Sequence, residues 1–303
     1  MKIAVMGAGA VGSYYGGLLA RASHELTLIG RATHADAVRR NGLRLQTLSF
    51  DETLAINASS APDGVAGADW VLVCVKAGDT EAAATAIAPH LSDGALVLSL
   101  QNGVDNADRL QALLPRQSVQ PVLVYAAVEL ASPGHVRHHG RGELVIGAGP
   151  HSDAVARVFS AAGIPVQILS DLRAALWSKL VVNCAYNALS AISRLPYGSM
   201  IRGPGIEATM REAVAECLAV ARAGGIELPA DSWLQVRALA DAMPTQSSST
   251  AQDLARGRRS EIDHLNGHVV RLGDALGVPT PVNRTLYGLV KLLESEPQPH
   301  QAA

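Results

Sequence analysis

One polar stripe on an otherwise apolar segment could support chemistry. Lys179, Asn183 and Asn187 stand four residues apart in a run rich in leucine, valine and alanine. At 100° per residue in a helix, the three side chains spread over only about 80° and form one narrow face. The two asparagines either satisfy neighbouring backbone groups or line a cleft and wait for a ligand. An ammonium is costly to desolvate, so a purely structural, buried role is unfavourable for Lys179.

A second polar segment covers residues 246–267. Its serine run, Ser247-Ser248-Ser249, could cap a helix or donate hydrogen bonds to a carboxylate. Glu261 stands at the expected start of a helix, where the helix dipole favours a negative charge. The segment is therefore a second candidate for polar contacts to a ligand.

The first residues of the chain contain a phosphate-binding pattern. A short β-prone run, residues 2–6, is followed by Gly7, Gly9 and Gly12 in the spacing G-x-G-x-x-G, with Ala8, Ala10 and Val11 between them. In a strand-turn-helix unit the three glycines allow a tight turn, a close approach of backbone to a pyrophosphate, and close helix packing. The phosphates would lie on the amides of the helix N-terminus. We therefore expect a dinucleotide site built from residues 7–12.

Polar residues at three expected strand ends indicate which dinucleotide binds. The strand over residues 25–29 is followed by Arg31 rather than by an acid, and the strand over residues 69–75 is followed by Lys76. An acid at this place would bond the ribose hydroxyls of NAD, whereas Arg suits the 2′-phosphate of NADP. Asn102 follows the next strand and could contact cofactor and substrate, although Asn-Gly is also a common turn pair. We expect NADP as the cofactor.

Two groups of histidines invite a metal interpretation. His264 and His268 are four apart, as in a zinc-binding helix, but no Glu follows His264. His135, His138 and His139 have no acidic or cysteine partner at ligand spacing. We therefore expect no metal site, and a solvated hairpin around residues 135–139.

Composition and length narrow the class of protein. The chain has 303 residues, 48% of them hydrophobic and 17% charged, which is enough for a large core and about two domains. A net charge of −2 offers no broad basic surface for nucleic acid. The apolar runs are too short for a membrane span, and no export signal precedes the first strand. Three separated cysteines suit a reducing compartment, so we expect a cytoplasmic protein.

The pattern of elements predicts two domains of different class. Residues 1–170 alternate strands and helices, which predicts a Rossmann-type, doubly wound α/β domain that binds NADP. Within it, residues 120–146 read as β-structure with turns at 132–134 and 140–142. From residue 171 to 303 strand patterns stop, and amphipathic helices are expected over 172–191, 269–276 and 283–294, followed by a frayed tail from Pro297. This all-α region is expected to carry the substrate and catalytic residues.

These features together resemble the ketopantoate reductase family, the 2-dehydropantoate 2-reductases. The resemblance covers nearly the whole chain in order and rests on Gly7-x-Gly9-x-x-Gly12, Arg31, Lys76, Gln101-Asn102-Gly103, Lys179 with Asn183 and Asn187, Ser249, and the segment 257–267. It implies NADPH-dependent reduction of ketopantoate to pantoate. It also implies that Lys179 is the general acid and that Glu261 binds the substrate hydroxyl. Asn183, Asn187 and Ser249 would be further substrate contacts.

The implied reaction has a physical basis in these residues. Hydride delivered to a ketone carbon leaves negative charge on oxygen, which needs a positive donor aimed at it. Desolvation would favour neutral Lys179 and a nearby Glu261 would favour the ammonium, so together they could keep a proton available. A closing cleft would bring the small 2-oxo acid to the cofactor. A homodimer is left open.

Some positions depart from the family pattern. Tyr197 stands where the family commonly has Asn, Ala188 replaces a frequent Pro, and Thr250 a frequent Met. Because these positions are expected on the substrate side, a related NADPH-dependent reductase for a different 2-oxo acid is an alternative. A non-catalytic NADPH-sensing protein is a second alternative, although it would not need both Lys179 and Glu261.

Overall fold

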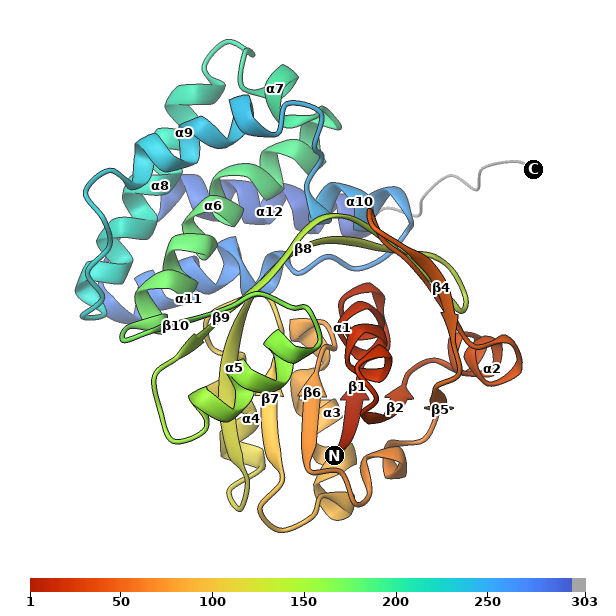
Figure 1. Cartoon of the computed structure of the whole chain (residues 1–303). Helices are drawn as coiled ribbons and strands as arrows, with labels where there is room; N and C mark the ends of the chain where they lie inside the picture. Colours follow the sequence, from red (N-terminus) through yellow and green to blue (C-terminus); the bar gives the residue numbers. More distant parts are fainter. Residues whose placement is uncertain (296–303) are drawn as a thin grey trace. The chain divides into compact units, whose positions relative to one another are not determined.

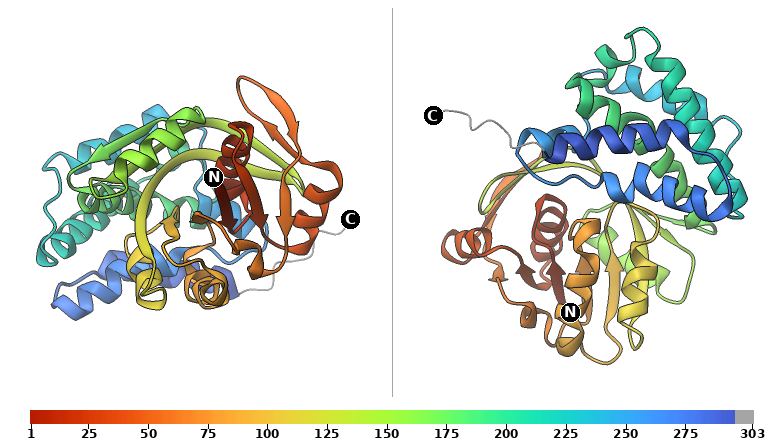
Figure 2. Two further views of the ribbon diagram at one scale, coloured as in Figure 1. Left: turned by 60° about the horizontal axis from the view of Figure 1, so that its bottom comes forward. Right: turned by 180° about the vertical axis from the view of Figure 1, so that it is seen from behind.

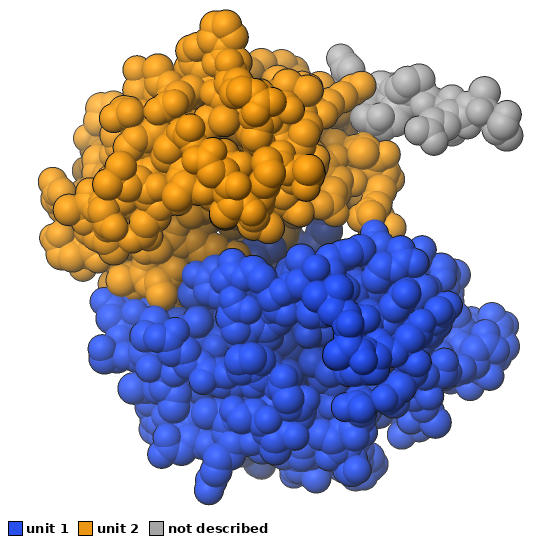
Figure 3. All heavy atoms as spheres, turned by 45° about the horizontal axis from the view of Figure 1, so that its top comes forward, with its two compact units in different colours: residues 1–172 blue, residues 173–303 orange. Residues whose placement is uncertain are grey.

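The computed structural model describes residues 1–295, and its contacts divide the chain into two compact units, Met1–Leu172 and Arg173–Ala303 (Figure 3). The division lies close to the expected boundary near Ser170. The expected frayed tail from Pro297 lies outside the described residues. Each unit is built around its own set of elements (Figure 1).

Unit 1 contains a mixed sheet in the order β4-β3-β9-β8-β7-β6-β1-β2-β5, with β10 paired to β9. Its strands are β1 (Lys2–Met6), β2 (Glu25–Ile29), β3 (Leu43–Gln46), β4 (Asp51–Leu54), β5 (Asn57–Ser59), β6 (Trp70–Val73), β7 (Leu96–Ser99), β8 (Ser118–Ser132), β9 (His135–Gly147) and β10 (Val166–Leu169). The run from β8 through β5 is parallel. The register pairs Met6 with both Ile29 and Val73, so the carboxyl ends of these strands lie at one edge of the sheet.

Helices cover both faces of this sheet. They are α1 (Ala10–Arg21), α2 (Ala32–Asn41), α3 (Thr80–Ile87), α4 (Asn106–Leu113) and α5 (Ser152–Ala161), with short 3₁₀ turns η1 (Pro62–Val65), η2 (Ala77–Asp79) and η3 (Ala88–His90). Because side chains alternate along a strand, Ile3 and Val5 of β1 join one core cluster with Tyr15 of α1. Ala4 joins a second cluster with Leu110 of α4. Two cores on opposite faces are what a doubly wound fold requires.

The β8–β9 pair forms a long antiparallel hairpin that curves over α1 (Figures 1 and 2). The expected turn at 132–134 connects the two strands. The turn expected at 140–142 is wrong, because these residues lie inside β9 at a register shift, with Arg141 at φ +61°. The irregularity bends β9 toward α1, where Tyr15 Oη donates to the Gly142 carbonyl over 3.2 Å.

Unit 2 is helical throughout its described part. Its helices are α6 (Leu172–Ser193), α7 (Tyr197–Met200), α8 (Ile206–Ala223), α9 (Ser232–Ala242), α10 (Ser249–Ala255), α11 (Asn266–Leu276) and α12 (Pro281–Ser295), with the 3₁₀ turn η4 (Ile262–His264). Helices α8, α11 and α12 pack on one another. Glu216 of α8 accepts the amide hydrogens of Val282 and Asn283 over 2.8 and 2.9 Å, which caps the start of α12.

The predicted fold class, a Rossmann-type domain followed by a helical region, is confirmed. Helix α2 and the short strands β3, β4 and β5 were not anticipated. Cys74, Cys184 and Cys217 are free thiols. Among residues 1–295, no helix combines the length and hydrophobicity needed to cross a membrane.

Candidate active site

The glycine loop between β1 and α1 has the geometry of a phosphate cradle. A Cβ on Gly7 would lie 2.5 Å from the Val75 amide nitrogen, and one on Gly12 would lie 2.3 Å from the Gly7 carbonyl oxygen, so neither position tolerates a side chain. A Cβ on Gly9 would meet no described atom within 4 Å. Gly9 is also the N-cap of α1, and no side chain in residues 1–295 caps this helix. The first-turn amides of α1 are therefore available to an anion that approaches over Gly9.

The glycine loop lies between the ends of two strands, and a basic residue follows each of these strands in the sequence. The amides of Gly7 and Ala8 donate to the Ile29 carbonyl at the end of β2 over 2.9 and 2.8 Å. Arg31 follows two residues later as the exposed N-cap of α2. On the other side, the contact of Gly7 with Val75 places the loop beside the end of β6, where Lys76 follows. Arg31 and Lys76 thus flank the glycine loop at one sheet edge.

Asn102 reaches the same edge from β7, and a buried polar network supports it. Gln101 Nε2 donates to Thr80 Oγ1 over 2.8 Å and to the Val75 carbonyl over 3.2 Å. Asn106 Nδ2 donates to the Asn102 carbonyl over 2.7 Å. These bonds join the loop that carries Lys76 to the loop that carries Asn102.

Sequence reasoning missed most of this network. Thr80, Asn106 and Arg109 were not singled out, and Gln101 was named only within the motif Gln101-Asn102-Gly103 of the family resemblance. Arg109 donates to the Ala77 carbonyl over 2.8 Å and pairs with Glu81 at 2.6 Å. The sequence gives little indication of Thr80, Asn106 and Arg109, because single polar residues in the first turns of two separate helices show no local spacing pattern.

In unit 2, the stripe on α6 becomes more buried along the helix. Lys179 and Asn183 are half-buried, whereas Asn187 is only 4% exposed. Within the described chain, the side chain of Asn187 has no hydrogen-bond partner. Its Oδ1 and Nδ2 are nevertheless not among the fully buried polar atoms that lack a partner, so they keep contact with solvent and can meet a ligand. This favours the ligand-binding interpretation of the asparagines over the structural one.

Helix α10 packs its start against the end of this stripe. Ser248 is the N-cap of α10 and accepts the Ala251 amide hydrogen over 3.0 Å, so the capping interpretation holds for this serine. Its hydroxyl donates to the Asn187 carbonyl over 3.1 Å. Ser249, the candidate substrate contact, is the exposed first residue of α10.

The positions that depart from the family pattern are all buried. Tyr197 is 7% exposed and its ring centroid lies 4.5 Å from that of Tyr186, and burial raises the pKa of Tyr197. Ala188 is fully buried on α6. Thr250 is 1% exposed, and its hydroxyl has no hydrogen-bond partner in the described chain.

Glu261 is half-buried and directly precedes η4 in the irregular segment between α10 and α11.

Three of the histidines that belong to the two metal-like patterns contact other side chains. His138 stacks on Tyr14 with centroids 4.7 Å apart, and His139 lies 3.1 Å from Glu129. His268 lies edge-on to Trp177. Each of these three histidines thus has an aromatic or carboxylate neighbour.

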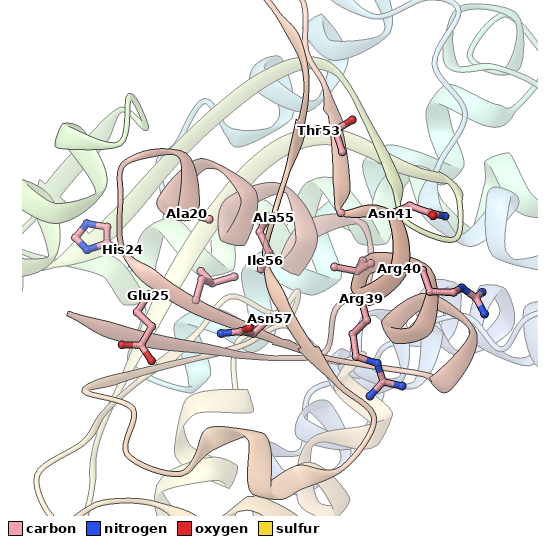
Figure 4. Close-up of a pocket in the computed structure, with 13 residues that line it drawn as sticks. Ala20, His24, Glu25, Arg39, Arg40, Asn41, Thr53, Ala55, Ile56 and Asn57 are labelled. Carbon is pink, nitrogen blue, oxygen red and sulfur yellow. The ribbon is translucent and has the colours of Figure 1, made fainter.

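A hollow of ≈ 600 Å³ on unit 1 lies apart from all these residues (Figure 4). It is at the amino end of β2, where His24 and Glu25 stand on one side, and Arg39 and Arg40 on the other. None of the predicted site residues lines it. The charged side chains do not converge on one point, so the hollow does not compete with the glycine loop as the cofactor site.

Comparison with known families is decisive for the class of enzyme. The model described as ketopantoate reductase PanE/ApbA matches residues 3–151, and its C-terminal counterpart matches residues 171–294. The chain belongs to the ketopantoate reductase family. It is therefore an oxidoreductase, as the resemblance predicted.

Individual members of the family match over their full length. A 2-dehydropantoate 2-reductase of Halobacterium salinarum is 36% identical, covering 98% of this chain and 100% of the relative. The crystal structure of a PanE/ApbA family ketopantoate reductase from Ralstonia eutropha JMP134 is 61% identical with a TM-score of 0.95, covering 97% and 98% of the two chains. A complex of D-mandelate dehydrogenase with NADH is 25% identical with a TM-score of 0.89, covering 97% and 99%. The ketopantoate reductase fold thus also occurs in a dehydrogenase of another 2-hydroxy acid.

Proposed function

We propose that this protein reduces ketopantoate to pantoate with NADPH and that Lys179 is the general acid. The observation that carries the proposal is the α6 stripe, in which Lys179 is followed on the same face by two asparagines. Asn187 is buried there without a hydrogen-bond partner among residues 1–295. Such a stripe suits an anionic, oxygen-rich substrate, because it offers one ammonium and two carboxamides in a row.

The cofactor proposal rests on the fit of unit 1 to a dinucleotide phosphate. The open space over Gly9 and the uncapped start of α1 would receive the pyrophosphate. Arg31, at the end of β2 where NAD enzymes usually have an acid, would pair with the 2′-phosphate, and Lys76 would add a second cation. When bound, NADPH supplies the hydride for the reduction.

The remaining chemistry belongs to the helical unit. The ammonium of Lys179 holds a proton toward the C2 ketone oxygen and gives it up as that oxygen gains negative charge. The π bond of the ketone is lost, a C–H bond and an O–H bond form, the C–O single bond remains, and Lys179 regains its proton from solvent. Asn183, Asn187 and Ser249 orient the substrate, and Glu261 accepts a hydrogen bond from its hydroxyl.

A second substrate is favoured by one specific observation. Tyr197 places a buried phenol ring against Tyr186 where the family commonly has a carboxamide. This exchange would make the acyl end of the site less polar and would suit a 2-oxo acid with a larger apolar group. The D-mandelate dehydrogenase similarity is consistent with such a change of substrate within one fold.

A substrate panel tests the proposal. NADPH oxidation is followed with ketopantoate, with aliphatic 2-oxo acids and with the aromatic acid phenylglyoxylate. We expect the highest kcat/KM for ketopantoate. A higher value for phenylglyoxylate would favour the second candidate, and no turnover of any 2-oxo acid would overturn both.

A further inference from the structure

Glu261 lies on an irregular segment, yet its proposed role in binding the substrate hydroxyl requires that its carboxylate points in a defined direction. The segment between α10 and α11 begins with the exposed residues 256–259 and contains only the 3₁₀ turn η4. A side chain on such a segment is positioned by whatever holds the backbone on either side. On both sides of Glu261 that support comes from the same helix, α12.

The first anchor lies immediately before Glu261. The backbone amide and the hydroxyl of Ser260 both donate to Glu294 Oε1, over 2.8 and 2.7 Å. The side chain of Glu294 is only 6% exposed. Burial opposes the charge of this carboxyl, but the hydrogen bonds from Lys291 and Ser260 outweigh it and lower the pKa of Glu294. The carboxylate is therefore a charged acceptor fixed in the interior.

The second anchor lies two residues after Glu261. The carboxylate of Asp263 accepts hydrogen bonds from Tyr287 Oη over 2.7 Å and from Lys291 Nζ over 2.8 Å. Lys291 also donates to Glu294 Oε2 over 2.7 Å, so one ammonium joins both anchors. Charge-assisted bonds of this kind are shorter and stronger than neutral ones.

The packing around the two anchors is tight. Tyr287, Lys291 and Glu294 follow the spacing i, i+4, i+7 and share one face of α12. Ile262 is fully buried between the anchors. A Cβ on Gly267 would lie 3.0 Å from the Tyr287 ring, so the glycine at the start of α11 lets the tyrosine approach.

We propose that Tyr287, Lys291 and Glu294 are positioning residues that grip the chain on both sides of Glu261 and so fix its carboxylate for the substrate hydroxyl. The proposal rests on the proposed function, in which Glu261 binds that hydroxyl. These three residues touch no reacting atom. Their effect on the reaction passes through residues 260–263.

A pair of substrates that differ only in the hydroxyl separates this role from general stabilisation. Trimethylpyruvate is ketopantoate with the CH2OH group replaced by CH3, so it cannot bond Glu261. In Glu294→Ala and Lys291→Met, we expect KM for ketopantoate to rise roughly tenfold and kcat/KM for trimethylpyruvate to change less than about twofold. Binding of NADPH, measured by fluorescence titration, should not change.

Three further variants make the test more specific. Glu294→Gln keeps an acceptor for Ser260 and should recover most of the ketopantoate affinity. Arg284 also lies on α12 but away from the anchors, and Arg284→Ala removes its ion pair with Asp274 of α11, so kinetics with both substrates should not change. If Glu294→Ala does not fold, Tyr287→Phe removes one hydroxyl from the second anchor and is expected to raise KM for ketopantoate alone.

The outcomes distinguish the positioning role from the role of Glu261. Equal losses for both substrates, or a lower melting temperature with unchanged kinetics, would overturn the proposal. If Glu261→Gln changes the ratio between the substrates and the α12 variants do not, only the positioning role is wrong. If Glu261→Gln leaves that ratio unchanged, the role of Glu261 is wrong and the proposal falls with it.

Discussion

The carboxamide of Gln101 donates to the hydroxyl of Thr80 over 2.8 Å, and its oxygen accepts the Ser99 hydroxyl hydrogen over 2.9 Å. Because Thr80 begins α3 and Gln101 follows β7, this side chain ties together the loops that carry Lys76 and Asn102. We expect Gln101→Ala to weaken NADPH binding several-fold and to lower the free energy of unfolding by about 1–3 kcal/mol, since buried groups lose their partners. Fluorescence titration and urea unfolding measure the two effects.

Gln111 provides the matched control for that variant. Its side chain also makes three hydrogen bonds, to the Leu114 and Gln117 carbonyls and from the Val119 amide, but at the opposite end of the parallel strands. Gln111→Ala should therefore reduce stability without changing the dissociation constant of NADPH. Equal effects on cofactor binding in both variants would contradict the positioning role of Gln101.

Arg31→Ala should discriminate between the two nicotinamide cofactors. A charge-assisted hydrogen bond is worth about 1.5–3 kcal/mol, so we expect NADPH to bind roughly tenfold to a hundredfold more weakly. NADH lacks the 2′-phosphate, and its binding should hardly change. The control is Arg40→Ala, on the hollow at the other sheet edge. Equal losses for NADPH and NADH would refute the assignment of Arg31.

His34 should make unit 1 less stable in acid. It is 4% exposed, its Nδ1 accepts the Gly134 amide hydrogen over 3.0 Å, and its Nε2 lies 3.1 Å from Ser13 Oγ. Nδ1 is thus unprotonated, and Nε2–H donates to Ser13. Burial lowers the pKa of His34 below its usual 6.5.

The sign of the pH effect follows from that lowered pKa. The unfolded chain binds the proton more readily than the folded one, so the contribution of His34 is complete above about pH 6.5 and is lost as the pH falls below it. Urea unfolding of the wild type and of His34→Gln between pH 7.5 and 5 measures it. The variant should lose less stability on acidification, and identical slopes would show that His34 is not responsible.

Lys179→Ala tests the general acid directly. Removing one donor to a developing oxyanion typically costs about 10²–10³ in kcat, and we expect a loss of that size here. NADPH binding should remain, because the residues proposed to bind the cofactor lie in unit 1. Ser178→Ala is the neighbouring control, since the Ser178 hydroxyl bonds the Ala174 carbonyl of its own helix. Near-normal turnover of Lys179→Ala would eliminate the proposed role.

The sequence predicted those parts of the fold, and suggested those candidate site residues, that depend on local pattern. The glycine spacing, β2 and the α6 stripe could be read because each follows a short period or a fixed motif. The bend at Gly140–Gly142 was mistaken for a turn because glycines mark both, and only the partner strand and α1 decide between them. The polar network of Gln101 and Thr80 could not be predicted, because it joins residues 21 positions apart through the tertiary fold.

Asn187 offers a test in which substrate binding should change and stability should not. Its carboxamide has no hydrogen-bond partner in residues 1–295 but keeps some contact with solvent, so Asn187→Ala breaks no hydrogen bond within the protein, and the free energy of unfolding should stay within about 1 kcal/mol of wild type. KM for ketopantoate should rise at least about tenfold, because the substrate loses that partner.

Asn266 is the contrasting case in the same unit. It is fully buried, and although its Oδ1 has no partner in the described chain, its Nδ2 donates to the Cys184 carbonyl over 3.1 Å and to Asn283 Oδ1 over 2.9 Å. Asn266→Ala should therefore destabilise the protein by about 1–3 kcal/mol, because those two buried acceptors lose the hydrogen bonds that Nδ2 donates. Urea unfolding and steady-state kinetics on both variants give the comparison. If Asn187→Ala is as destabilising as Asn266→Ala and leaves KM unchanged, Asn187 is a structural residue and the α6 stripe does not bind the substrate.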